Sequence, residues 1–306
     1  MDNPNQVKNQ RLAYILALIA ILFWSTIGSA FKLTLDYISY VEVLLYASFI
    51  AVVSLSVILA AQGKTKLLLK TTKSDLVRSA LYGFLNPFLY YMILIKAYDI
   101  LQAQEAVALN YTWPIALVLL SIPILKQKIG LKSILALFVS FFGILVITTK
   151  GKFDTFEFNE PLGISLALGS SVVWAMYWIV NLRDKRDEIP KLLLNFAFGF
   201  FYTLLAAIFT GNLRMLPWEG YKGIMYIGLF EMGITFALWL KALRLSETTA
   251  KVSNLIFISP FLSLLFISVA VGEKIMLSTF TGLFFIVAGI LLQQINRRKI
   301  KRNERA

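Results

Sequence analysis

Two stretches of the sequence decide the fold: "YGFLNPFLYYMILIKAY" (82–98) and "IGLFEMGITFALWLKAL" (227–243). They align with each other, and the match extends beyond them in both directions, with a one-residue gap on the C-terminal side. The sequence therefore predicts two copies of one unit, 12–149 and 161–296, joined by a polar linker over 150–160. The aligned positions include Trp24 with Trp174, Gly83 with Gly228, Lys96 with Lys241, Pro114 with Pro260, Lys128 with Lys274, and "GIL" at 143–145 with "GIL" at 289–291.

Hydrophobicity assigns the chain to a membrane. Of its residues 58% are hydrophobic and 15% charged, and the mean hydropathy is +0.73. A helix needs about 20 apolar residues to cross the hydrocarbon core of a bilayer, and ten segments meet this length or come close to it. These are 12–31, 43–61, 79–95, 106–125, 133–149, 161–182, 192–213, 223–240, 252–272 and 275–296.

Five helices in each unit imply that the second unit enters the membrane from the opposite face. The expected fold is an all-α membrane protein of ten transmembrane helices, arranged as two inverted five-helix repeats with both termini cytoplasmic. Inverted repeats are typical of secondary transporters, whose substrates bind near the bilayer midplane between the repeats.

The basic residues support this topology. Of the 30 Lys and Arg residues, 23 fall in the segments that this topology places in the cytoplasm, as the positive-inside rule requires. The net charge of +13 therefore reflects membrane orientation and does not predict a nucleic-acid partner. The basic tail, 297–306, is expected to anchor this topology and is suited to contact anionic lipid head groups.

Several kinds of chemistry are excluded by composition. The chain has no Cys and no His, so disulfides, thiolates, imidazole relays and most zinc sites are absent, and no metal or cofactor is expected. "GKT" (63–65) lacks the glycine that a phosphate loop needs five residues earlier, where Ile58 stands. An intramembrane enzyme would need clustered acids or histidines near one interface, and the sequence lacks these. A purely structural or receptor-like protein would not explain polar and aromatic residues at midplane depth in both repeats.

The chain resembles the drug/metabolite transporter superfamily in its ten-helix form, which consists of two EamA-type repeats. The resemblance is carried by Trp24 and Trp174, by "LIKAYDILQAQEAVALNYTWP" and its partner "WLKALRLSETTAKVSNLIFISP", and by "GEKI" before "GLFFIVAGILL". The first repeat departs from the family pattern at Gln127, where an acidic residue is usual. Within the family, "ALNYTWP" (108–114) is similar to a motif of YddG-like exporters of aromatic amino acids and methionine. That resemblance implies a site with Tyr90, Tyr111, Trp113 and Trp174.

Depth and helical spacing suggest the binding residues. At about 1.5 Å per residue, several polar and aromatic side chains fall near the midplane, and Glu231, Thr235 and Trp239 share a helix face, as do Trp174, Tyr177 and Trp178. The alternatives are helix-bridging roles for the asparagines and interfacial belts for tryptophans, where Trp218 and Trp239 are expected. Glu273 is expected to cap or anchor the turn between the last two helices. The candidate substrate-binding residues are Trp24, Asn86, Tyr90, Asn110, Tyr111, Trp113, Trp174, Tyr177, Trp178, Glu231 and Thr235.

Glu231 is the most informative of these residues. A carboxylate at mid-membrane depth is costly unless it is neutralised, paired or hydrated, and its aligned partner in the first repeat is the neutral Asn86. It could be structural and protonated, or it could bind substrate or a proton. The second role predicts a secondary active or facilitative exporter of small metabolites that works by alternating access. Aromatic or apolar amino acids are the leading candidate substrates. Alternatives are cationic drugs, polyamines or nucleoside-like metabolites. Short loops and the lack of Cys favour the inner (plasma) membrane of a bacterium or archaeon, with the protein a monomer or weak dimer.

Overall fold

The computed structural model describes residues 8–125, 131–152, 160–181, 184–213, 215–247, 252 and 254–303, and this part of the chain is helical without strands. Gln127, Lys128 and most of the linker expected at 150–160 lie outside the described residues. The helices are α1 (Gln10–Leu35), α2 (Tyr40–Ala61), η1 (Thr65–Lys70), α3 (Lys73–Gly83), η2 (Phe84–Leu89), α4 (Tyr90–Ile100), α5 (Ala103–Asn110), α6 (Trp113–Leu125), α7 (Leu131–Thr148), α8 (Pro161–Asn181), α9 (Glu188–Phe209), α10 (Trp218–Ile227), η3 (Gly228–Gly233), α11 (Ile234–Leu245), η4 (Asn254–Ile258), α13 (Ser259–Phe266), η5 (Ile267–Val271) and α14 (Leu277–Asn303).

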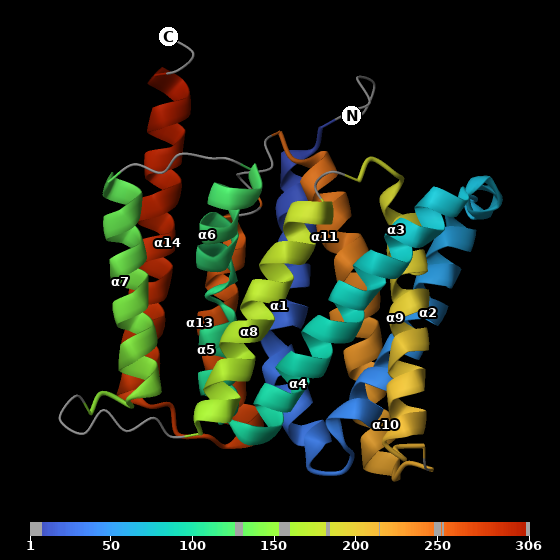
Figure 1. Cartoon of the computed structure of the whole chain (residues 1–306), viewed down its shortest axis with the longest axis horizontal. Coiled ribbons are helices and arrows are strands. Elements are labelled where there is room, and N and C mark those ends of the chain that lie inside the picture. Colours follow the sequence, from blue (N-terminus) through green and yellow to red (C-terminus); the bar gives the residue numbers. More distant parts are fainter. Residues whose placement is uncertain are drawn as a thin grey trace.

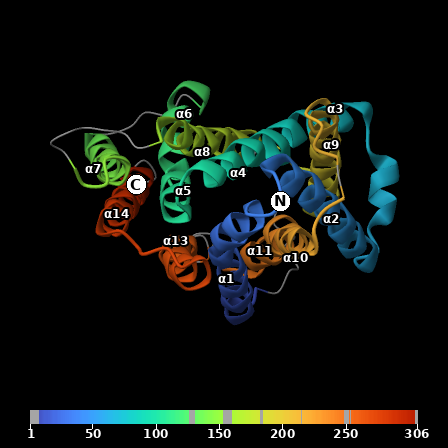
Figure 2. The ribbon, with the colours of Figure 1, turned by 90° about the horizontal axis from the view of Figure 1, so that it is seen from below.

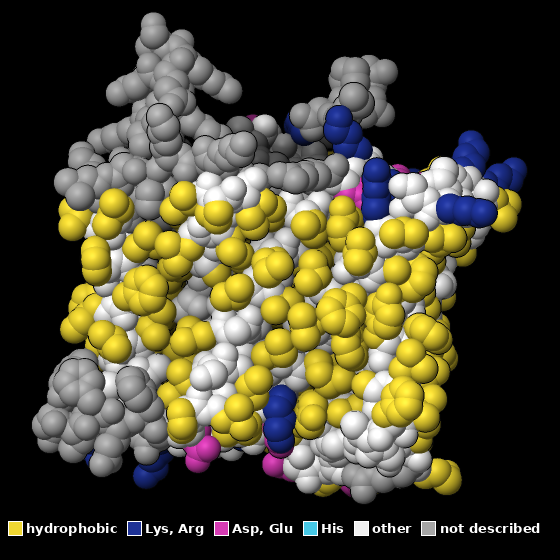
Figure 3. All heavy atoms as spheres, in the orientation of Figure 1, with side chains coloured by type: hydrophobic (Ala, Val, Ile, Leu, Met, Phe, Trp, Pro, Cys, Tyr) yellow, Lys and Arg dark blue, Asp and Glu magenta, His cyan; other side chains and the backbone are white. Residues whose placement is uncertain are grey.

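The membrane class is confirmed by the length and composition of the helices. In the part of the chain that the structure describes, seven helices are long and apolar enough to cross a bilayer, counting α3–η2–α4, α5–α6 and α10–η3–α11 as continuous segments, and three shorter apolar helices accompany them. Side chains of Lys, Arg, Asp and Glu gather near the upper and lower edges of the molecule in Figure 3, and hydrophobic side chains cover the height between them. Whether all ten segments span the membrane stays a prediction, as does the cytoplasmic location of the termini.

Capping residues define where several helices begin. Ser39 and Glu42 form a capping box at the start of α2, and Thr72 and Asp75 form one at the start of α3. Asn9 accepts a hydrogen bond from the backbone amide of Leu12 at the start of α1. These side chains satisfy amides that have no partner within the helix, so the polar segments between the apolar runs define the helix ends.

Helices of the first half pack mainly against helices of the second half. Contacts join α7 to α14, α2 to α9, α1 to α11 and α4 to α8. The first turn of α1 and the last turns of α14 lie on the same side of the bundle in Figure 1. In Figure 2, α7 and α14 form one end of the bundle, α2, α3 and α9 form the other, and α1, α4, α8 and α11 lie between them.

Two of the long segments are broken in the middle. In α3–η2–α4 the break includes Pro87, which cannot donate a backbone hydrogen bond, and Asn86, whose backbone is extended (φ −148°, ψ 119°). In α10–η3–α11 the break is the π-helical segment η3, which ends at Gly233 (φ −104°, ψ −90°) and contains Glu231. Both breaks lie at the depth of the candidate site, and both follow a glycine that lies against a neighbouring helix.

Candidate functional site

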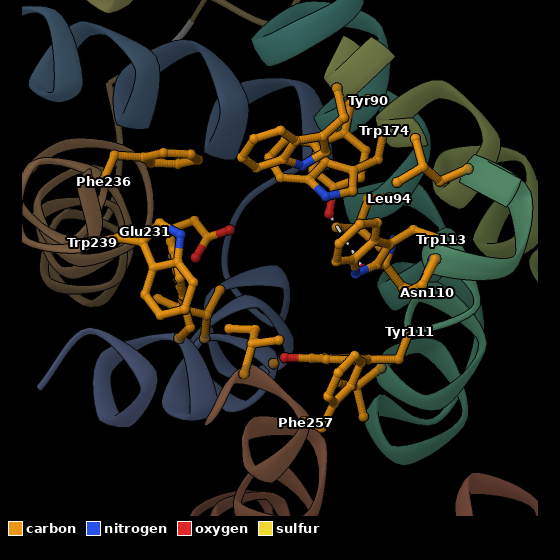
Figure 4. A pocket seen from close by; sticks show the side chains of 18 of the residues that line it. Tyr90, Leu94, Asn110, Tyr111, Trp113, Trp174, Glu231, Phe236, Trp239 and Phe257 are labelled. Carbon is orange, nitrogen blue, oxygen red and sulfur yellow. Dashed lines mark hydrogen bonds between the residues drawn. The ribbon is translucent and has the colours of Figure 1, made fainter. Parts of the chain in front are cut away.

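A cavity of about 510 Å³ lies in the middle of the bundle, between helices of the two halves. Its wall is built by α1, α4, α5, α6 and α8 together with η3, α11 and residues of η4 (Figure 4). The lining is mostly apolar and aromatic, with a few hydroxyl, amide and carboxyl groups. This combination is typical of pockets that bind small molecules.

Eight of the eleven predicted binding residues line this cavity. The pattern of depth and spacing located them on five segments that are far apart in the sequence, and the fold brings these segments together. Their role in binding stays a prediction. The eight residues are Trp24, Tyr90, Asn110, Tyr111, Trp113, Trp174, Trp178 and Glu231.

Asn86, Tyr177 and Thr235 do not line the cavity, although all three are buried. The extended backbone of Asn86 removes it from the helical face that it would share with Tyr90. The wider π-helical turn of η3 changes the relation between Glu231 and Thr235, whose hydroxyl donates to the carbonyl of Phe230. Helical spacing fails for Asn86 and Thr235 because the helices are not regular there. Tyr177 lies in the regular helix α8, and its ring packs on Trp174 without lining the cavity.

Trp239 and Phe236 line the cavity as well, and neither was among the predicted binding residues. The expectation that Trp239 belongs to an interfacial belt is wrong, because only 7% of its surface is exposed and its ring centroid lies 5.3 Å from that of Trp24. Its spacing of eight residues from Glu231 would have indicated the cavity. No sequence signal distinguishes Phe236 from the many other apolar residues of its helix.

One side of the cavity is a wall of stacked rings. Tyr90 stacks on Trp174 with 4.7 Å between ring centroids, and Tyr177 also stacks on Trp174 at 5.6 Å. The hydroxyl of Tyr90 donates to Oδ1 of Asn110 (3.3 Å), and Nδ2 of Asn110 donates to Ser170 (2.9 Å). These contacts hold the rings in place before a ligand arrives, and the parts of Tyr90 and Trp174 that line the cavity can make aromatic or cation–π contacts.

Glu231 faces this wall across the cavity, and its carboxylate points inward (Figure 4). The hydroxyl of Tyr91 donates to Oε1 at 2.8 Å. Among the residues that line the cavity in the described part of the chain, Glu231 is the only charged one. The site therefore has a single carboxylate, without a Lys or Arg in the lining to pair with it.

Polar contacts, one set within the first half and one between the two halves, close the bundle at the end where α1 finishes. Nζ of Lys32 donates to the carbonyls of Tyr98 (3.0 Å) and Leu101 (2.8 Å). Glu273 accepts from the backbone amides of Ala103 (2.8 Å) and Gln104 (3.2 Å), so it caps the start of α5. Glu273 thus anchors the turn between the last two helices, as expected, and its partners lie in the first half.

The chain matches a known protein family along most of its length. The family model of the EamA-like transporter family matches the chain twice, over residues 11–149 and 161–293. The chain is similar to an uncharacterized transporter of Clostridium kluyveri, with 27% identity over 76% of each chain. It is also similar to the uncharacterized transporter YvbV of Bacillus subtilis, with 25% identity over 94% of this chain and 92% of that one.

The fold has a counterpart among known structures. One crystal structure superimposes with a TM-score of 0.65 over 95% of this chain and 99% of that one, at 19% identity. That identity supports the shared fold alone. The two family matches together cover most of the sequence, and the protein belongs to the EamA-like transporter family.

Proposed function

We propose that the protein moves small metabolites across the membrane by alternating access, as a secondary active or facilitative transporter. Membership of the EamA-like family indicates membrane transport of small molecules, and the names of its relatives indicate a transporter rather than an enzyme. The observation that carries the proposal is the cavity between the two halves, where aromatic faces lie opposite one carboxylate. A site at such an interface can open to either side when the halves move against each other.

The proposed substrate carries an ammonium group and an apolar or aromatic body. Glu231 would neutralise the ammonium group, or exchange a proton for it, while Trp24 and Trp174 contact the body. An aromatic or apolar amino acid fits this description. The carboxylate of such an amino acid would accept hydrogen bonds from hydroxyl and indole groups such as those of Tyr111 and Trp113.

A second class of substrate, cationic drugs or polyamines, is favoured by one specific feature. In the described part of the chain, no Lys or Arg lines the cavity to balance a substrate carboxylate. Counterflow in proteoliposomes with amino acids, nucleosides and organic cations would separate the two classes. Exchange only of solutes that carry no ammonium or other cationic group would contradict both.

We further propose that the segments matched by the family model are two inverted five-helix repeats with both termini in the cytoplasm. The contact of α1 with α11 has its counterpart in that of α8 with α4, as an inverted repeat requires. The relatives include proteins of Bacillus subtilis and Archaeoglobus fulgidus, which supports the inner membrane of a bacterium or archaeon as the location. The expected state is a monomer or weak dimer.

This topology can be tested with single cysteines, because the chain has none of its own. Lys152→Cys should react with an impermeant thiol reagent added to intact cells, since the topology places Lys152 outside and its side chain is exposed. Lys70→Cys, exposed at the opposite end, should react only after lysis. The reverse pattern would overturn the orientation.

A further inference from the structure

Three polar side chains meet outside the cavity, behind its aromatic wall. Asn86 of η2, Tyr177 of α8 and Asn195 of α9 have 0%, 2% and 0% of their surface exposed. The amides of Asn86 and Asn195 lie beside the hydroxyl of Tyr177, and the ring of Tyr177 stacks on Trp174. These three residues, called here the buried polar cluster, lie where the segment α3–η2–α4 is broken.

The polar atoms of this cluster make no well-formed hydrogen bond in the described part of the chain. Both amide atoms of Asn86, both of Asn195 and the hydroxyl of Tyr177 are buried without a hydrogen bond of acceptable geometry to any described residue, although the three side chains lie close to one another. Leaving five such atoms buried without partners would cost a large part of the stability of a protein. A small polar ligand between the three side chains would satisfy them.

The backbone around the cluster departs from a regular helix. Pro87 has no amide hydrogen to donate to the carbonyl of Gly83, and η2 is wound as a π-helix, whose hydrogen bonds span one residue more. The helices are tightly packed here, because a Cβ on Gly83 would press on the backbone of Asn195, and one on Gly199 would press on the ring of Pro87. The close packing keeps bulk solvent and larger ligands away from the cluster.

We propose that the buried polar cluster is an internal water site, at which ordered water bridges Asn86, Tyr177 and Asn195. A buried water molecule makes about three hydrogen bonds, both donated and accepted, and the cluster offers both kinds of partner. A cation would take only the oxygens, leaving the amide hydrogens of both asparagines unsatisfied. The three side chains also include no carboxylate to balance a charge. Water is therefore the ligand that fits.

The internal water site would allow the broken segment α3–η2–α4 to bend at η2. Water can exchange its hydrogen bonds as α4 pivots relative to α3, so no polar atom is left unsatisfied while the cavity wall moves. A direct bond between two protein groups would have to break instead. The role as a hinge rests on the proposed transport cycle, whereas the presence of water does not.

Hydroxyl-radical footprinting of the full-length protein in nanodiscs tests the site without any substrate. X-rays generate radicals from bound water, so Tyr177 should be modified despite its burial. Met232, fully buried at the second break and outside the cavity lining, is the matched control and should stay unmodified although methionine oxidises readily. In the double variant Asn86→Leu/Asn195→Leu, modification of Tyr177 should fall to the level of Met232.

The outcomes distinguish the alternatives. Modification of Tyr177 no greater than that of Met232 in the wild type overturns the water site. A change in that modification when sodium is replaced by choline at constant ionic strength overturns it in favour of a cation. If the double variant does not fold, a density map of the wild type that resolves ordered water decides. A folded double variant that has lost the water yet transports at the wild-type rate overturns only the hinge, and substrate counterflow by the wild type tests the transport proposal separately.

Discussion

The two breaks, η2 at Asn86 and η3 at Glu231, are both π-helical segments in the middle of a long helix, but they carry different side chains. Each interrupts a segment of 28 residues, and each follows a glycine that lies against a helix of the other half. Gly83 lies against α9, and Gly228 lies against α2 at the carbonyl of Ala47. The shared geometry agrees with the sequence alignment, in which the two glycines are equivalent.

The side chains at the breaks differ. Asn86 is neutral and sealed among other polar groups, whereas Glu231 carries a carboxyl group into the cavity and accepts a hydrogen bond from Tyr91. Since the first break forms without an acid, the fold does not require an acid at the second. The difference agrees with the proposal that Glu231 binds substrate or a proton.

The polar contacts of the helices that lead into the two breaks also differ. Near the first, Nη1 of Arg186 donates to the carbonyl of Asp75 (3.0 Å) and to Ser79 (2.9 Å), and Nη2 contacts Asp184 at 2.6 Å. These contacts fix the start of α3 to the segment before α9. The contact between α1 and α10 ahead of the second break is a hydrogen bond between neutral hydroxyls, those of Thr26 and Tyr226, at 2.6 Å.

The largest expected effect comes from removing the ionic contacts of the first break. Arg186→Ala should lower the free energy of unfolding by about 3 kcal/mol, because it leaves the buried carboxylate of Asp184 without its partner. Arg244→Ala removes a contact of the same length, 2.6 Å to Glu188, but between exposed side chains, and should cost less than about 1 kcal/mol. Thermal unfolding in detergent measures both, and equal losses would contradict the difference in burial.

The glycines test whether the two breaks have the same steric demand. Gly83→Ala and Gly228→Ala should each cost about 1–3 kcal/mol, because the added methyl group meets backbone atoms of the neighbouring helix. Gly169→Ala is the control: nothing lies within 4 Å of its Cβ position, and alanine is favoured over glycine in a helix. Melting temperatures of the three variants should therefore separate into a lowered pair and an unchanged or raised control. A lowered value for one break alone would show that the breaks are not equivalent.

The aromatic wall contributes a smaller effect, on binding rather than stability. Trp174→Ala should weaken apparent substrate affinity about tenfold, equal to about 1.4 kcal/mol, because a ring face is lost. Trp113→Ala should likewise lower transport with membrane insertion intact. Trp218→Ala, with 68% of the side chain exposed away from the cavity, should leave affinity unchanged. Initial rates of uptake at varied substrate concentration measure these effects, and wild-type affinity in both cavity variants would remove the wall from the site.

The smallest expected effect is a pH dependence of stability at the first break. Burial alone would raise the pKa of Asp184, but hydrogen bonds from Arg186 outweigh it and hold the pKa below its ordinary value. A lowered folded-state pKa means that Asp184 stabilises the protein above its ordinary pKa, and that this stability is lost as pH falls through the folded value. The melting temperature should therefore decline less steeply with acid in Asp184→Asn than in the wild type. Parallel curves would contradict the assignment.

Much of the fold could be predicted from sequence patterns that do not depend on every helix being regular. Apolar length predicted the spanning segments, and alignment of the two halves paired Gly83 with Gly228, although it did not predict the breaks beside them. Depth along a helix predicted the cavity residues well, because depth changes little when a helix bends. The odd number of segments per repeat and the basic residues predict an orientation that cysteine labelling has yet to test.

Predictions that assumed a regular helix or a local partner were less successful. Thr235 was grouped with Glu231 by helical spacing, which the π-helical turn of η3 alters. Glu273 was expected to cap or anchor its turn, but no sequence signal indicated its partners, which are 170 and 169 residues away in the first half. Trp239 was assigned to the membrane interface because tryptophan is common there, although only tertiary packing decides which tryptophans face inward. Such contacts between distant segments have no signal in a single sequence.

The pH dependence of transport by Glu231→Gln is the most direct test of the proposed role of this carboxyl group. In proteoliposomes loaded with a substrate found by counterflow, the variant should fold normally but lose substrate affinity or the pH dependence that the wild type shows, because glutamine keeps the shape and removes the charge. Glu105→Gln is the matched control, since Glu105 is also buried in a spanning segment but pairs with Lys150 at 3.5 Å and does not line the cavity. Wild-type rates and unchanged pH dependence in Glu231→Gln would contradict the proposal and assign Glu231 a structural role.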